Sequence, residues 1–231
     1  VSMTLAWLDR LGIVYRNEDM RRFTVPGGQR YRPFDAYIPA DFSSATFFAV
    51  AAAVTGARIT LKGLDFADTQ GDKAVIDIIE RMGARVGKAD RAITIEGGEM
   101  KGGVFDLNAI PDALPALAVA GCFARGETRL VNVPQARLKE TDRIAVMRSE
   151  LSKMGADIEE TPDGLVIRQS DLSGAAVRGH ADHRVVMALS VAALAARGET
   201  TIDTAESVAV SFPAFRELMC SLGADIELME D

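Results

Sequence analysis

The residues best suited to chemistry lie in one short stretch, residues 137–144, which reads RLKETDRI. Lys139 and Arg143 could hold an anion, and Glu140 between them could exchange a proton. The stretch precedes a pattern typical of an amphipathic helix, whose free N–H groups also favour anions. The alternative is a solvated charged face, in which Glu140 and Asp142 neutralise the cations. The spacing alone fits both interpretations.

Three aspartates stand at equivalent places before three predicted buried helices: Asp41, Asp112 and Asp182. Each lies 14–16 residues before a glycine that recurs at positions 56, 126 and 198. An aspartate in this position is expected to cap its helix, which stabilises the helix by about 1 kcal/mol. Capping alone does not explain why His183 and Arg184 directly follow Asp182. The free N–H groups at the start of a buried helix favour anions, so these residues could belong to an anion-binding site.

A sequence pattern that repeats about every 70 residues must position the RLKETDRI stretch and the three aspartates. Glycines at 12, 83, 155 and 223 each end a predicted amphipathic helix and precede a predicted strand. Glycines at 56, 126 and 198 follow alanine-rich segments, at 43–54, 113–124 and 184–196, that are apolar all round and therefore predicted to be buried helices. Further strands are predicted at 21–28, 34–39, 91–100 and 163–170. The pattern predicts a mixed α/β (α+β) fold of βαβαββ units, with buried helices inside and sheets around them.

The helix after RLKETDRI illustrates the predicted amphipathic pattern. Its expected buried face is formed by Ile144, Met147, Leu151 and Met154. Charged side chains, namely Arg148, Glu150 and Lys153, are expected to point elsewhere.

Residues 1–39 contain only the second half of a repeat unit: an amphipathic helix and two predicted strands, with no buried helix before them. A repeat protein is not expected to begin in mid-unit. We therefore expect residues 1–39 to be a remnant of another domain, residues 40–231 to form the main domain, and the chain to be part of a longer or split protein.

The composition excludes several classes of protein. The chain of 231 residues has 33 acidic and 26 basic residues, and its formal net charge is −7. General affinity for nucleic acid or an anionic membrane is not expected. The sequence has neither a membrane-length apolar run nor a signal-peptide pattern, so a cytoplasmic location is predicted. Cys122 and Cys220 lie in predicted helices and are expected to be free thiols rather than nucleophiles.

RLKETDRI closely resembles the R-x-K-E-[ST]-D-R signature of the 5-enolpyruvylshikimate-3-phosphate (EPSP) synthase family. The segments IPDALPALAVAGCFARGET, ADHRVVMALSVAAL and SFPAFRELMCSLGADIE resemble further landmarks of that family, in the same order. The resemblance covers essentially the whole chain and corresponds to about the C-terminal half of the family's enzymes. It implies an inside-out α/β barrel fold, in which βαβαββ units surround buried parallel helices.

The resemblance also implies an activity: transfer of the enolpyruvyl group of phosphoenolpyruvate to the 5-hydroxyl of shikimate 3-phosphate, with release of phosphate. The family is the glyphosate target of the shikimate pathway, which leads to chorismate and the aromatic amino acids, and it needs no metal or organic cofactor. By motif, Asp112 would act as the base toward the hydroxyl, and Glu140 would exchange a proton at the methylene carbon. The anions of phosphoenolpyruvate would be held by Lys139, Arg143 and Arg184.

Other positions are assigned supporting roles or depart from the family pattern. His183 would support the anion pocket rather than act as base. Gln135 replaces an Asn common in the family, at a place that contacts shikimate 3-phosphate. Val210 replaces a common Lys, and Ala40 replaces the Gly of the usual Gly-Asp pair. The absent half would carry further phosphate-binding Lys and Arg residues, a Gly-rich stretch and a Ser-Ser-Gln segment.

The sequence also permits other interpretations of function. The chain alone could be a non-catalytic, anion-binding half-protein that acts only with an N-terminal partner. A related enzyme, UDP-N-acetylglucosamine enolpyruvyl transferase, lacks RLKETDRI and uses a loop cysteine, which disfavours it here. His180, Asp182 and His183 could be interpreted as a metal cluster, but no further ligands stand at a usual spacing, so no metal is expected.

Overall fold

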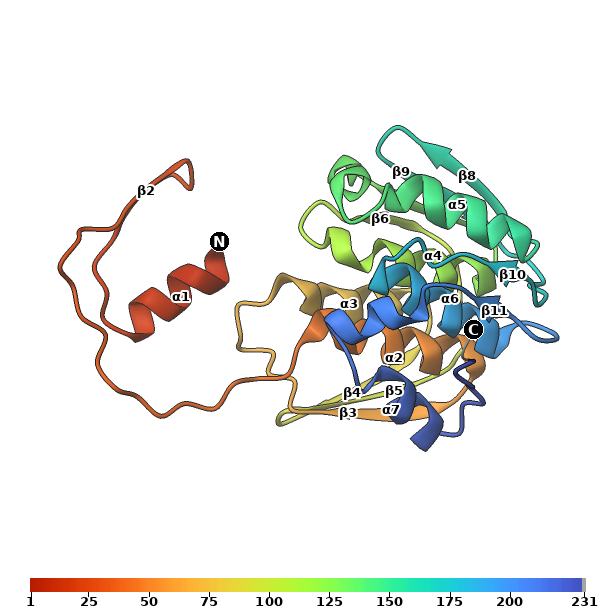
Figure 1. Cartoon of the computed structure of the whole chain (residues 1–231), viewed down its shortest axis with the longest axis horizontal. Helices are drawn as coiled ribbons and strands as arrows, with labels where there is room; N and C mark the ends of the chain where they lie inside the picture. The colour runs from red at the N-terminus through yellow and green to blue at the C-terminus, as the bar shows by residue number, and fades with distance from the viewer. Residues whose placement is uncertain (230–231) are drawn as a thin grey trace.

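The computed structural model describes residues 1–229, which form a main body and an N-terminal segment that stands apart from it (Figure 1). The N-terminal segment contains helix α1 (Ser2–Arg10) and the hairpin of β1 (Arg16–Glu18) and β2 (Arg22–Thr24). Within this segment Ile13 is buried, and residues 25–40 run to the main body without helix or strand.

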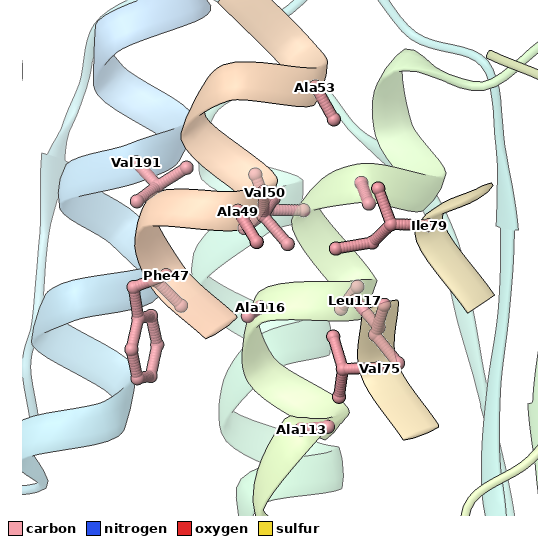
Figure 2. Packing of buried hydrophobic residues seen from close by; sticks show 14 of the residues in the cluster. Phe47, Ala49, Val50, Ala53, Val75, Ile79, Ala113, Ala116, Leu117 and Val191 are labelled. Atoms are coloured by element: carbon pink, nitrogen blue, oxygen red, sulfur yellow. The ribbon is translucent and has the colours of Figure 1, made fainter. Parts of the chain in front are cut away.

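Three helices form the centre of the main body: α2 (Phe42–Thr55), α4 (Leu114–Phe123) and α6 (His183–Ala195). They pack against one another through small and aliphatic side chains, and Figure 2 shows residues of α2 and α4 meeting between the helices. Alanine-rich sequences permit this close approach because they present little side-chain volume. The three predicted buried helices are therefore confirmed.

Sheets lie outside the central helices. The first has the order β3-β5-β4, and the second has the order β6-β7-β9-β8. Their strands are β3 (Arg58–Lys62), β4 (Arg85–Ala89), β5 (Ala92–Glu96), β6 (Val104–Asp106), β7 (Glu127–Val131), β8 (Asp157–Thr161) and β9 (Gly164–Arg168). A third, two-stranded parallel sheet joins β10 (Ala176–Val177) to β11 (Thr201–Ile202).

The remaining helices are α3 (Ala74–Arg81), α5 (Arg143–Lys153) and α7 (Phe215–Ser221), with short 3-10 helices η1 (Gly71–Lys73), η2 (Pro111–Ala113), η3 (Pro134–Leu138) and η4 (Ala205–Val210). The order β6-α4-β7-α5-β8-β9 is one complete βαβαββ unit. The recurring glycines all have positive φ angles, from 68° to 113°, as expected of residues that end helices. The predicted mixed α/β fold is confirmed, although the sheets do not close into a barrel within residues 1–229.

Two predicted strands are wrong. Residues 34–39 form no strand, and neither do residues 224–229 after Gly223. A strand requires a partner for its backbone groups, and each of these segments lacks a continuous one. Directly after the first of these segments, the Ala40 N–H donates a hydrogen bond to the carbonyl of Gly63, the residue that follows β3.

One side chain of α5 also departs from the predicted pattern. Ile144, Met147, Leu151 and Met154 are buried as expected. Glu150 was expected on another face, but its side chain is only 2% exposed because its carboxylate is bonded within the protein.

Among the described residues, no helix combines the length and apolar character that crossing a membrane requires.

Candidate active site

The starts of α2 and α6 are capped as predicted. Asp41 accepts hydrogen bonds from the backbone N–H groups of Ser43 and Ser44, at 2.9 and 3.0 Å. Asp182 accepts one from the N–H of Arg184, at 2.9 Å. The Arg184 guanidinium then donates to the Ser43 hydroxyl across 2.9 Å, which joins the starts of the two helices.

Asp112 does not cap its helix, which corrects the expectation of three equivalent caps. It lies in η2, where a 3-10 turn beginning at Pro111 leads into α4, and its carboxylate makes no capping hydrogen bond to the start of that helix. One oxygen, Oδ1, lies 3.1 Å from Lys139 Nζ and 2.8 Å from Arg143 Nη1. The other, Oδ2, lies 3.9 Å from Arg184 Nη2. Cations from two separate segments therefore surround this carboxylate.

Arg143, the first residue of α5, is fully buried, and its side chain is 1% exposed. Its Nε donates to Asp182 at 2.8 Å, and its Nη2 donates to Glu140 at 2.5 Å. With the bond to Asp112, one guanidinium links three carboxylates. Arg143 thus holds the three carboxylates in place from the interior of the protein. Its predicted direct contact with a substrate anion stays a prediction.

The charges of the site act on the pKa values of its acids. Burial alone would raise the pKa of Asp112, but the charges of Arg184, Lys139 and Arg143 and the hydrogen bond from Lys139 lower it below the usual value. Burial likewise opposes ionisation of Asp182, and the bond and charge of Arg143 lower its pKa in turn. Both groups are therefore carboxylates near neutral pH.

Glu140 is the most open carboxylate of the site, with a side chain that is 46% exposed. His183 Nδ1 lies 3.9 Å from Glu140 Oε1. Burial lowers the pKa of His183, and the nearby charge of Arg184 lowers it further, so the imidazole is neutral near pH 7. The arrangement leaves Glu140 as an accessible carboxylate beside a neutral histidine, and its predicted role in proton exchange stays a prediction.

Lys139 and Arg184 are the cations of this group that reach the surface, with side chains 30% and 13% exposed. Gln135, in η3, donates its amide to the Asn108 carbonyl at 2.9 Å and thus faces the loop before Asp112. Val210 lies at the end of η4 and is exposed.

Sequence reasoning missed Asp72, in η1. Burial raises its pKa, and the charges of Asp112, Arg184 and Asp41 act on it as well, which places it beside the site. The neighbouring Gln70 is buried and accepts a hydrogen bond from the Phe42 N–H at 2.8 Å, so the loop of Asp72 is fixed to the start of α2. A Gln-Gly-Asp sequence just before the amphipathic helix α3 was the available signal.

The three residues considered as a metal cluster face different partners. His180 Nε2 lies 3.0 Å from Glu150, Asp182 faces Arg143, and His183 lies beside Glu140. Within the described part of the chain, no three His, Cys, Asp or Glu side chains gather in a way that could hold a metal ion.

Cys122 is buried, and burial raises the pKa of its thiol to about 12. Cys220 is partly buried, and both cysteines are free thiols.

The chain is similar to known proteins over nearly its whole length. The family model of EPSP synthase (3-phosphoshikimate 1-carboxyvinyltransferase) matches residues 1–219. A relative of that name from Ruminiclostridium cellulolyticum is 60% identical over 99% of this chain and 54% of its own length. One from Methanocaldococcus jannaschii is 44% identical over 99% of this chain and 53% of its length. The chain thus spans about half the length of the curated relatives it matches.

A solved structure is also similar. EPSP synthase from Acinetobacter baumannii superposes with a TM-score of 0.87 and 32% identity, covering 98% of this chain and 55% of that one. The similarity therefore includes the three-dimensional arrangement of the helices and sheets.

Proposed function

We propose, from the premise that this chain belongs to the EPSP synthase family, that it supplies about half of an enolpyruvyl transferase. The complete enzyme would transfer the enolpyruvyl group of phosphoenolpyruvate to the 5-hydroxyl of shikimate 3-phosphate in the shikimate pathway. Residues 1–39 would belong to the domain of the other half, and residues 40–231 would form the C-terminal domain. A cytoplasmic location stays a prediction.

One observation carries the proposal: the Asp112 carboxylate lies against Lys139, Arg143 and Arg184, close to the starts of α2, α4 and α6. An acid that exchanges protons must stand beside groups that hold the anionic substrates, and this cluster supplies both.

The chemistry assigns a role to each group. Asp112 would accept the proton of the 5-hydroxyl as its oxygen bonds to C2 of phosphoenolpyruvate, while Glu140 in its protonated form would give a proton to the methylene carbon. The resulting tetrahedral intermediate carries the phosphate on C2. Loss of a methyl proton, returned to Glu140, then re-forms the double bond and expels phosphate, which takes the proton from Asp112. Lys139 and Arg184 would balance the substrate charges throughout.

Electrostatics explain why this chain would need its other half. The cations Lys139, Arg143 and Arg184 already face the carboxylates of Asp112, Glu140 and Asp182. Two substrates that carry several negative charges need further cations and a second wall that excludes water. We therefore expect the chain alone to be inactive.

The test is phosphate release with both substrates, measured for the chain alone and after mixing with the N-terminal half of the Ruminiclostridium cellulolyticum relative. Copurification of the two halves first checks assembly. We expect turnover only in the mixture, with Asp112→Asn lowering kcat by about 10²–10⁴-fold. Asp90→Asn, on an exposed turn, serves as the matched control.

The alternatives predict different results. Turnover by the chain alone at the rate of the mixture would overturn the half-enzyme proposal. An assembled complex without phosphate release would favour a non-catalytic anion-binding half. Release only when UDP-N-acetylglucosamine replaces shikimate 3-phosphate would favour the related transferase.

A further inference from the structure

The loop that delivers Asp182, His183 and Arg184 to the site has an unfavourable backbone. His180 and Ala181 both have positive φ angles, 55° and 53°. Side chains with a Cβ rarely adopt this left-handed conformation, and two in succession cost on the order of 1–3 kcal/mol each. The loop must therefore be held by its surroundings.

Glu150 of α5 holds one side of this loop. Its Oε2 accepts a hydrogen bond from the Arg178 N–H at 2.8 Å, and its Oε1 lies 3.0 Å from His180 Nε2. The carboxylate is 2% exposed, and Lys153 Nζ also lies 2.6 Å from Oε2. A buried carboxylate is costly unless its oxygens are bonded in this way.

The opposite side of the loop is held from the segment after β11. Asp203 Oδ1 accepts from the Gly179 N–H at 2.7 Å, and Thr204 Oγ1 accepts from the Ala181 N–H at 3.0 Å. The amides of Arg178, Gly179 and Ala181 thus donate to side chains that lie on two elements, α5 and the segment after β11.

Helix α5 is consequently joined to this loop at two points. Its first residue, Arg143, bonds Asp182, and Glu150 bonds the loop two turns later. We infer that Glu150 is a positioning residue of the anion site, which fixes loop 178–182 and thereby the location of Arg184. This inference rests on the proposed function for its catalytic consequence, but the loop geometry itself does not depend on that function.

The chemistry of the contacts suggests a discriminating pair of variants. Glu150→Met keeps the volume but removes both acceptors, so the loop loses its attachment. Glu150→Gln keeps an oxygen for the Arg178 N–H, and its amide can donate to His180 if the imidazole takes its other tautomer. Arg148→Met is the matched control, because it removes a charged side chain from the exposed face of the same helix.

The first measurement is hydrogen–deuterium exchange of residues 178–184 in this chain. We expect exchange to become at least tenfold faster in Glu150→Met and to stay within threefold of the parent in Glu150→Gln and Arg148→Met. Asp203→Ala, which releases Gly179 from the other side, should also accelerate exchange and serves if Glu150→Met does not fold. If exchange is unchanged in Glu150→Met, the inference is overturned. Where Asp203→Ala replaces that variant, unchanged exchange in Asp203→Ala overturns it.

The second measurement is steady-state kinetics of the assembled halves. Because Arg184 would bind substrate rather than transfer protons, Glu150→Met should raise KM for phosphoenolpyruvate at least tenfold while kcat stays within threefold. Glu150→Gln should restore KM. An unchanged KM despite faster exchange overturns the positioning role. Absence of turnover in the parent mixture contradicts the proposed function instead, and the exchange result still decides whether Glu150 holds the loop.

Discussion

At the scale of single residues, the site depends on one buried guanidinium shared by three acids. The sequence predicts that Arg143 helps to hold a substrate anion, and the fold buries it against Asp112, Glu140 and Asp182. Local spacing indicated that the residue begins a helix. It could not reveal partners 31 and 39 positions away, which only the packing of α4, α5 and α6 brings together.

Asp182→Ala should destabilise the chain strongly. Asp182 is fully buried, and its removal leaves part of the Arg143 charge without compensation, a change that typically costs about 3–5 kcal/mol. The free energy of unfolding, measured in urea, checks this. Asp41→Ala is the control, since it removes only a helix cap and should cost about 1 kcal/mol. Equal losses in the two variants would contradict the hub role of Arg143.

Asp72→Asn should stabilise the chain at pH 7. Burial and the negative charge of Asp112 raise the pKa of Asp72 in the folded state, so ionisation disfavours folding. Stability is therefore lost as pH rises from the ordinary value, about 3.9, through the raised folded value. The variant should unfold at a higher temperature than the parent at pH 7 and show no gain near pH 3. Asp90→Asn should show no such pH-dependent gain; a parallel gain there would attribute the effect to net charge.

At the scale of elements, the buried helices were predictable because their composition is diagnostic, whereas two strands were not. Alanine-rich, apolar segments have few alternatives to a helix packed on all sides. Residues 34–39 and 224–229 have strand-like sequences, but a strand exists only where another strand completes its hydrogen bonds. The sequence reports the propensity of a segment and not the presence of its partner.

Gly121→Val should destabilise the core through overpacking. A Cβ at this position of α4 would lie 3.2 Å from the Ile167 Cβ and 3.3 Å from the Thr128 Cβ, so a branched side chain has no room. The expected loss is about 1–3 kcal/mol of unfolding free energy, measured in urea. Ala193→Val, on the partly exposed face of α6, is the control and should change stability much less. Comparable effects would indicate that helix propensity, not packing, dominates.

At the scale of the whole molecule, the N-terminal segment contributes little to the stability of the body. Residues 1–36 contain one buried residue, Ile13, whereas Tyr37 already contacts the body through the Gly63 carbonyl and the Arg91 guanidinium. A chain that begins at residue 37 should keep the unfolding midpoint of the full chain within about 3 °C. A large fall in the midpoint, measured by circular dichroism, would show that the segment is integral to the body.

The extended stretch from residue 25 to residue 40 has a further consequence. The segment before it, residues 1–24, is held near the main body at an effective concentration of about a millimolar, set by the length of the tether rather than by affinity. An interface joined in this way can be weak and still form most of the time. Such an interface also separates quickly, so movement of the two parts relative to each other need not be slowed by a tight contact between them.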